Sequence, residues 1–153
     1  PQSSRYCVWL ESGGRIRGLR FRPFIWKQRE IMAARKFFAK VTSIGEFAVE
    51  FMEEGVLVFF GQNAPEELQE HAVVHDSAHP LTEDVVVGDT VRIGDHSWEV
   101  LAVGNVANDN LRNLGHLVLK FNGLKEPEMR GDINVAEEKI PPIDPGLEVE
   151  ITS

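Results

Sequence analysis

The histidines are the residues of this sequence that point most directly to chemistry. There are five of them, and the chain contains no nucleophilic serine motif and no glycine-rich phosphate-binding loop. A neutral imidazole is a nucleophile near pH 7, so it can serve as a general base, a metal ligand or the carrier of a transferable group. Any chemistry is therefore expected to depend on the histidines, which are His71, His75, His79, His96 and His116.

Three of these histidines are spaced four residues apart, which raises the possibility of a metal site. On a helix, His71, His75 and His79 would lie along one face as ligands. On a strand, residues four apart are separated by ~13 Å, too far to share one zinc ion. The apolar residues 72–74 favour a strand, and Pro80 disfavours helical backbone at His79. We therefore expect no metal and no other cofactor, with a histidine-ligated metal as the weaker alternative.

His75 is the histidine best placed for catalysis. It ends an apolar run that reads as a strand, and the polar residues Asp76 and Ser77 follow it. A nucleophile at the exit of a rigid strand, beside a polar loop, is held firmly and can be reached by a partner. For His79 and His96, by contrast, we expect solvated or hydrogen-bonded side chains without a chemical role.

The elements that would position these histidines are short apolar runs separated by Gly, Asn, Asp and Pro, a pattern typical of an all-β domain. The Ile93–Trp98 segment resembles a tight hairpin, which favours antiparallel pairing. Two short helices are expected, one opening at Asn63 with Pro65 in its first turn and one over Ala107–Asn113. The predicted strands are Lys36–Ile44, Val56–Phe60, Ala72–His75, Thr90–Ile93, Trp98–Val103, His116–Phe121, Asp132–Ala136 and Leu147–Ile151.

Length and charge limit the possible functions. A chain of 153 residues with 42% hydrophobic residues is expected to build one sizeable core. Its net charge of -8 argues against nucleic acid or an anionic membrane as the main partner. No apolar run approaches the ~20 residues that cross a bilayer, so we expect no direct membrane insertion. The lone Cys7 and the absence of a signal segment favour the cytoplasm.

The charge is distributed unevenly along the chain. Residues 1–31 carry a net charge of +5, and the remainder carries -13. Such an asymmetry indicates a boundary, so we predict a basic N-terminal extension or leader at residues 1–31 and a β domain at residues 32–153. A basic, aromatic arm that contacts a membrane or nucleic acid is the alternative for the first segment.

Two blocks of the sequence resemble the glucitol/sorbitol-specific enzyme IIA family of the sugar phosphotransferase system. The first is Asn63–Leu68 leading into Val73–His75, and the second is the longer stretch Val100–Leu124. They occur in the expected order and spacing, and the resemblance covers roughly Arg35–Thr152. Some members have a second histidine where this chain has Ser77. Residues 1–31 have no counterpart that we identify.

The resemblance implies an all-β, barrel-like domain, here expected to be a single antiparallel one with one or two short helices. It also implies a phosphotransferase that needs no cofactor: the phosphocarrier protein HPr would phosphorylate His75, and a cysteine of the cognate enzyme IIB would receive the group for a membrane sugar permease (enzyme IIC). Because two proteins must reach His75, we expect its ring to be exposed within a flattish patch.

Other residues of the second block have open roles. His116 matches the family motif in Gly115–Leu117, which implies a supporting role as a donor to the phosphoryl oxygens or as an orienter of His75; a satisfied strand histidine is the alternative. Arg112 is a candidate for balancing phosphate charge, although a surface arginine is the commoner outcome. At the level of the whole chain, the alternative function is a non-catalytic β-barrel binding or regulatory module, against which the presence of His75 argues.

Overall fold

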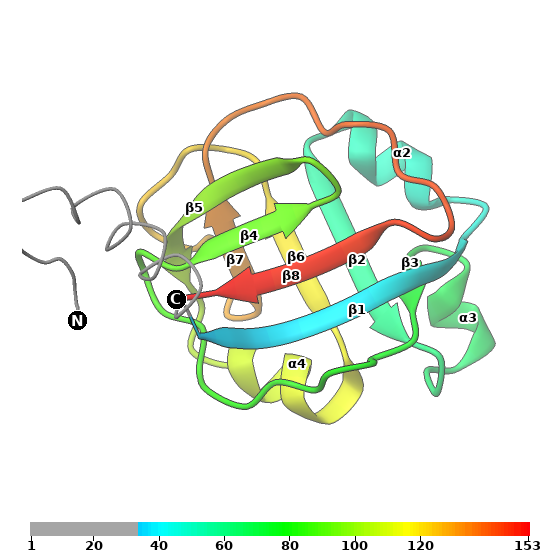
Figure 1. Cartoon of the computed structure of the whole chain (residues 1–153). Coiled ribbons are helices and arrows are strands. Elements are labelled where there is room, and N and C mark those ends of the chain that lie inside the picture. The colour runs from blue at the N-terminus through cyan, green and yellow to red at the C-terminus, as the bar shows by residue number, and fades with distance from the viewer. Residues whose placement is uncertain (1–33) are drawn as a thin grey trace, which may run out of the picture. The chain divides into compact units, whose positions relative to one another are not determined.

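The computed structural model describes residues 34–153, and the predictions for residues 1–31 lie outside this part of the chain. The described residues form a closed eight-stranded barrel in which the strand order is β1-β3-β2-β6-β7-β5-β4-β8 (Figure 1). The barrel closes where β1 pairs with β8, the two strands that cross the front of the view. The strands are β1 (Arg35–Ile44), β2 (Val56–Gly61), β3 (Val73–His75), β4 (Thr90–Ile93), β5 (His96–Val103), β6 (Leu117–Lys120), β7 (Asp132–Val135) and β8 (Glu148–Thr152).

All eight predicted strands are confirmed, each within two residues at either end. The expectation of wholly antiparallel pairing is wrong in two of the eight described pairings, because β2 runs parallel to β3 and β6 runs parallel to β7. Parallel neighbours require a crossover in place of a hairpin. Residues 62–72 and 121–131 supply these crossovers, and the first of them contains helix α3.

The core lies inside the barrel and follows the alternation of the strands. In β4 and β8, every second side chain is buried, which places Val91, Ile93, Val149 and Ile151 on the inner face. Aromatic side chains from β1 and β2, Phe37 and Phe59, extend the same cluster toward the end of β3. Because these side chains are close-packed inside the barrel, the strands around them form a rigid frame for β3.

Three short helices flank the barrel in the described region: α2 (Ala48–Glu53), α3 (Glu66–Gln69) and α4 (Ala107–Leu114). The predictions of α3 and α4 are confirmed, whereas α2 was not expected from the sequence. Its inner face consists of little more than Ala48 and Met52, and the apolar Val49 and Phe51 point to solvent, so no continuous apolar stripe indicates a helix.

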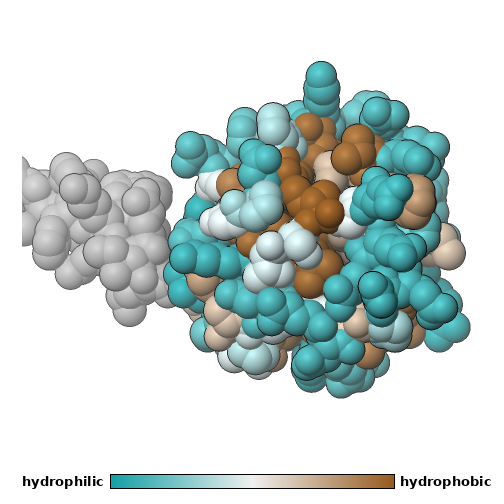
Figure 2. Space-filling model, turned by 90° about the vertical axis from the view of Figure 1, so that its right-hand side faces the viewer, coloured by the Kyte–Doolittle hydropathy of each residue, from teal (hydrophilic) through white to brown (hydrophobic). Residues whose placement is uncertain are grey.

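The side of the barrel that carries α2 and α3 has an apolar patch surrounded by hydrophilic residues (Figure 2). Exposed apolar side chains from these two helices include Val49, Phe51 and Leu68. Within residues 34–153, no helix is both long and apolar enough to cross a membrane.

Candidate active site around His75

His75 is the last residue of β3, a strand that lies between β1 and β2. Its backbone pairs with Val41 on one side and Gly61 on the other. The imidazole is only 1% exposed and meets the ring of Phe37 edge-on, at 5.5 Å between ring centroids. The expectation of an exposed ring is therefore wrong for this structure. Two neighbouring segments cover the ring, and each of them contacts one of its nitrogens.

The first of these segments is the turn that follows β3. The Asp76 carboxylate accepts hydrogen bonds from the backbone N–H groups of Lys40 and Ala78, which fixes the turn to β1. Ser77, which lies between Asp76 and Ala78, adopts a left-handed conformation with φ of 51°, which is uncommon for a residue other than glycine. This conformation turns the Ser77 N–H back onto His75 Nδ1 at 3.0 Å, with Ser77 Oγ 3.1 Å from the same nitrogen.

The second segment is the end of α4. The helix stops at Gly115, whose φ of 64° is a left-handed C-cap, and the Gly115 N–H donates to the Leu111 carbonyl. The Gly115 carbonyl oxygen lies 2.7 Å from His75 Nε2. A side chain has no space at this position, because a Cβ on Gly115 would lie 2.9 Å from His75 Cε1. Glycine is thus required both for the cap and for the close approach to the ring.

These two contacts determine the tautomer of His75. A backbone N–H can only donate and a carbonyl can only accept, so Nδ1 carries the lone pair and Nε2 carries the hydrogen. Burial lowers the pKa of His75 below its usual 6.5, against the opposing effects of the Gly115 carbonyl and the Asp76 carboxylate. The ring is therefore neutral at pH 7, and Nδ1 is its nucleophilic nitrogen.

A hollow of about 280 Å³ lies beside the ring. Ser77 and Gly115, the two residues that bond to the imidazole, form part of its wall, together with Gly61 at the end of β2. The apolar Leu68 of α3 and Leu114 of α4 line it as well, and both are exposed to solvent. The site thus combines a buried neutral imidazole with an adjoining open space.

The chain is similar to known proteins of one family. The family model described as the PTS system glucitol/sorbitol-specific IIA component matches residues 36–150. The chain belongs to this family. Two proteins named PTS system glucitol/sorbitol-specific EIIA component, from Escherichia coli (strain K12) and Shigella flexneri, are each 35% identical to it over 119 residues, which cover 74% of this chain and 91% of theirs. As a IIA component, the protein is a phosphocarrier of a sugar phosphotransferase system and a phosphotransferase, which confirms both predictions.

A solved structure has the same fold. The PTS system IIA component from Enterococcus faecalis V583 superposes with a TM-score of 0.69 and 27% sequence identity. The match covers 76% of this chain and 99% of that one. The predicted barrel-like fold of the family is confirmed.

His116, the second histidine that matches the family motif, lies at the start of β6 and is engaged elsewhere. Its Nδ1 is 3.2 Å from the Phe59 carbonyl oxygen, and its ring stacks on Phe60 at 4.1 Å between centroids. Burial lowers the pKa of His116, partly offset by the bond to Phe59. No hydrogen bond joins His116 to His75 in the described residues, so Gly115 and Ser77 orient the imidazole. A role of His116 as donor to phosphoryl oxygens stays a prediction.

The other histidines lie apart from this site. His71 stacks on Phe47, and His79 forms a pair of backbone hydrogen bonds with Phe38. Among residues 34–153, no group of three His, Cys, Asp or Glu side chains could hold a metal ion. The helical spacing of His71, His75 and His79 is not realised, because β3 and its flanking loops separate them.

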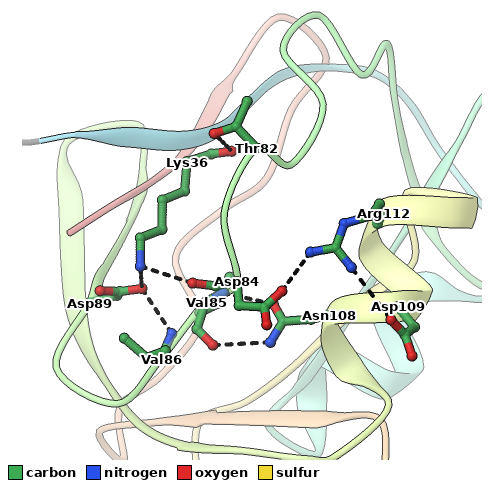
Figure 3. Close-up of polar contacts among 9 residues, drawn as sticks. All are labelled: Lys36, Thr82, Asp84, Val85, Val86, Asp89, Asn108, Asp109 and Arg112. Carbon is green, nitrogen blue, oxygen red and sulfur yellow. Dashed lines mark hydrogen bonds and ion pairs between the residues drawn. The ribbon is translucent and has the colours of Figure 1, made fainter.

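Arg112, which lines the hollow, belongs to a polar network that joins α4 to β1 and to the segment before β4 (Figure 3). Its guanidinium group is bound to the carboxylates of Asp84 and Asp109. The segment that bears Asp84 is itself fixed at two points. Asn108 of α4 bonds to both the N–H and the carbonyl of Val85, and Lys36 of β1 donates to the Asp84 carbonyl and to the buried Asp89 carboxylate.

Sequence reasoning missed Gly115 as a functional residue. The signal was present, since a glycine directly after a predicted helix indicates a left-handed C-cap. The contact of that cap with His75, which lies 40 residues earlier, is set by the pairing of β2 with both β3 and β6. The pattern around Gly115 alone carries no information about that contact.

Proposed function

We propose that His75 is the phosphohistidine of this IIA component and that Nδ1 is the nitrogen that carries the phosphoryl group. The single observation that supports this most strongly is the pair of opposed backbone contacts on the ring. Nε2–H is held by a carbonyl, so the lone pair available for attack is on Nδ1. The neutral state of the buried ring keeps that lone pair available near pH 7.

Transfer of the phosphoryl group to His75 requires no proton to move. The lone pair of Nδ1 forms a new N–P bond while the N–P bond of the donor phosphohistidine breaks, and its electrons return to the donor nitrogen. Nε2 keeps its hydrogen throughout. The positive charge that develops on the ring of His75 is stabilised by the Gly115 carbonyl oxygen, which accepts from Nε2–H. In the onward step, a thiolate attacks phosphorus and the electron pair returns to Nδ1.

Access to Nδ1 requires the turn at Asp76–Ala78 to open, because Ser77 covers that nitrogen. The left-handed conformation of Ser77 stores roughly 1 kcal/mol or more of strain, which favours the opening. The Ser77 N–H and hydroxyl can then donate to the phosphoryl oxygens instead of to Nδ1. Ser77, two residues after His75, is thus placed to hold the incoming group.

The partners follow from the family and from the surface around the hollow. We infer that HPr is the donor, and that a cysteine of a cognate enzyme IIB, acting with a IIC permease for a sugar of the glucitol/sorbitol type, is the acceptor. We therefore propose that the protein acts in the cytoplasm. The exposed Leu68 and Leu114 border the hollow and offer the apolar contacts that a docking protein would bury.

Phosphorylation in a reconstituted system tests this function. The full chain is incubated with phosphoenolpyruvate, enzyme I and HPr, and one acid-labile, alkali-stable phosphoryl group per chain is expected. Comparison of an alkaline digest with Nδ1- and Nε2-phosphohistidine standards identifies the nitrogen. His75→Gln removes the nucleophile and is expected to abolish labelling while the barrel remains folded.

His116→Gln is the matched variant for this experiment. It removes the imidazole whose Nδ1 bonds to the Phe59 carbonyl, so transfer is expected to slow by about tenfold or less, in keeping with the loss of one modest interaction. Wild-type protein that stays unlabelled beside a labelled IIA control would refute the carrier function. Labelling of His75→Gln but not of His116→Gln would make His116 the carrier.

A further inference from the structure

The hollow beside His75 has very little positive charge for a site that must receive a phosphoryl group. Such a group carries a charge of about -1.5 to -2 at pH 7. Of the described residues that line the hollow, Arg112 is the only cation and Asp76 the only acid. The Asp76 carboxylate is already occupied by two backbone N–H groups. The charge of a phosphoryl group at this site can therefore be balanced from the wall only by Arg112.

The present partners of Arg112 hold it loosely. Its guanidinium lies 2.5 Å from Asp84 and 3.4 Å from Asp109, but these two carboxylate side chains are 62% and 70% exposed. Exposed ion pairs contribute little and exchange readily. A guanidinium group matches the oxygens of a phosphoryl group with two parallel hydrogen bonds, which are stronger than contacts to a hydrated carboxylate.

The position of Arg112 also couples it to the nucleophile. It lies in the last turn of α4, three residues before Gly115, whose carbonyl oxygen sets the tautomer of His75. The backbone that bears the Asp84 carboxylate is held in place as well, because Lys36 bonds to the Asp84 carbonyl and Asn108 to the backbone of Val85 (Figure 3). Arg112 thus lines the hollow while its guanidinium is paired with the Asp84 carboxylate.

We propose that Arg112 is the phosphoryl-binding residue of this site and that Asp84 is its competing partner. This rests on the proposed function of His75. When His75 is phosphorylated, the guanidinium leaves Asp84 and binds the phosphoryl oxygens. When the group is passed on, the guanidinium returns to Asp84. The competition keeps the phosphorylated state from becoming too stable, which a carrier that must release its phosphoryl group requires.

Four variants of the full chain test this proposal with phosphorylated HPr as the donor. Arg112→Gln is expected to slow acceptance by about 10²–10³-fold, the usual effect of removing a donor to developing charge, and Arg112→Lys to fall between it and the wild type. Asp84→Asn is expected to act in the opposite direction, raising the ratio of phosphorylated to free protein at equilibrium by about two- to fivefold. Arg130→Gln, which changes an exposed arginine whose side chain donates to Asn105, is the matched control and should behave as wild type.

The outcomes separate this proposal from the proposed function. An unlabelled wild-type protein contradicts the function of His75, whereas a labelled wild type with an equally fast Arg112→Gln contradicts only the role of Arg112. If Asp84→Asn lowers the phosphorylated fraction as Arg112→Gln does, the pair is a structural contact and the proposal is wrong. If Arg112→Gln does not fold, the phosphorylated fraction of Asp84→Asn still tests the role of Arg112. The ¹⁵N chemical shift of the Arg112 guanidinium in the wild type tests it as well, because the shift must change on phosphorylation.

Discussion

The His75 site and the Lys36–Asp89 pair are both buried polar clusters, yet they are built in opposite ways. Around His75, the partners are neutral backbone groups, the Ser77 N–H and the Gly115 carbonyl. Around Lys36, the partners are full charges, with the ammonium 2.7 Å from the Asp89 carboxylate and both side chains about 5% exposed. The first cluster lies beside an open hollow, and the second is enclosed between β1 and the segment before β4.

This difference matches what each cluster has to do. Neutral hydrogen bonds contribute modestly to stability, so a bond such as that from the Ser77 N–H to Nδ1 can be exchanged for a bond to a ligand. A buried ion pair is hard to open, because the unpaired charge that remains is strongly unfavourable. The exchangeable bonds around His75 therefore suit chemistry, whereas the fixed Lys36–Asp89 pair suits the support of the segment before β4. The predictions below test that division.

Removal of the buried cation is expected to have the largest effect on stability. Lys36→Met leaves the Asp89 carboxylate without its charged partner, and we expect a loss of about 3–5 kcal/mol in the free energy of unfolding by urea denaturation. Arg35→Gln, which breaks the more exposed pair with Glu150, is the control and should lose about 1 kcal/mol or less. Similar losses in both variants would show that the enclosed pair is no more important than a surface one.

Gly115→Ala is expected to have the next largest effect and to act on both stability and transfer. A side chain disfavours the positive φ of this position, and the new Cβ would press against the imidazole. We therefore expect about 1–2 kcal/mol of destabilisation and slower phosphoryl acceptance. Gly146→Ala has a similar positive φ but its Cβ enters open space. Gly146→Ala therefore tests the backbone strain without a contact to the imidazole. If it slows transfer as much as Gly115→Ala does, the contact of the Cβ with the imidazole does not cause the slower transfer.

The lowered pKa of His75 predicts a pH dependence of stability. Because burial holds the folded-state pKa below 6.5, the unfolded chain binds more protons than the folded one as the pH falls through this value. Stability should therefore decrease as the pH falls through 6.5 and level off below the folded-state pKa. Urea denaturation of wild type and His75→Gln across this range measures the contribution, and equal slopes in the two proteins would exclude His75 as its source.

The smallest effect is expected for Ser77→Ala. This change removes the hydroxyl near Nδ1 but keeps the backbone N–H that sets the tautomer, so transfer should slow by roughly threefold or less. Single-turnover transfer from phosphorylated HPr measures it. A loss of a hundredfold or more would indicate that the hydroxyl, and not the backbone, holds the phosphoryl group.

Local patterns in the sequence predicted the strands and placed His75 at the end of one of them. The alternation of Val91 and Ile93 in β4, or of Val149 and Ile151 in β8, is a local property that depends only on which face is buried. The same holds for α4, which has a glycine at its end. Helix α2 was missed because its apolar side chains do not form one stripe.

The properties that matter most for the site could not be predicted from local sequence patterns. The burial of His75 and the choice of Nδ1 depend on a carbonyl at Gly115 and on a left-handed Ser77, and neither the long-range contact nor the φ of a serine is indicated by residue type. The parallel pairings were likewise hidden, since a crossover and a long hairpin loop look alike in sequence. The Lys36–Asp89 pair joins residues 53 positions apart without any motif to signal it.

The closure of the barrel through β1 and β8 has a consequence for folding. Arg35 pairs with Thr152, so the first and last strands of the described domain must meet before the barrel is complete. Contacts between residues so distant in sequence slow folding, because the chain loses much conformational entropy before they form. While the protein is being synthesised, one edge of β1 stays open until residues 148–152 have left the ribosome, and an open edge can pair with another chain. The acidic excess of residues 32–153 opposes such pairing between nascent chains by charge repulsion.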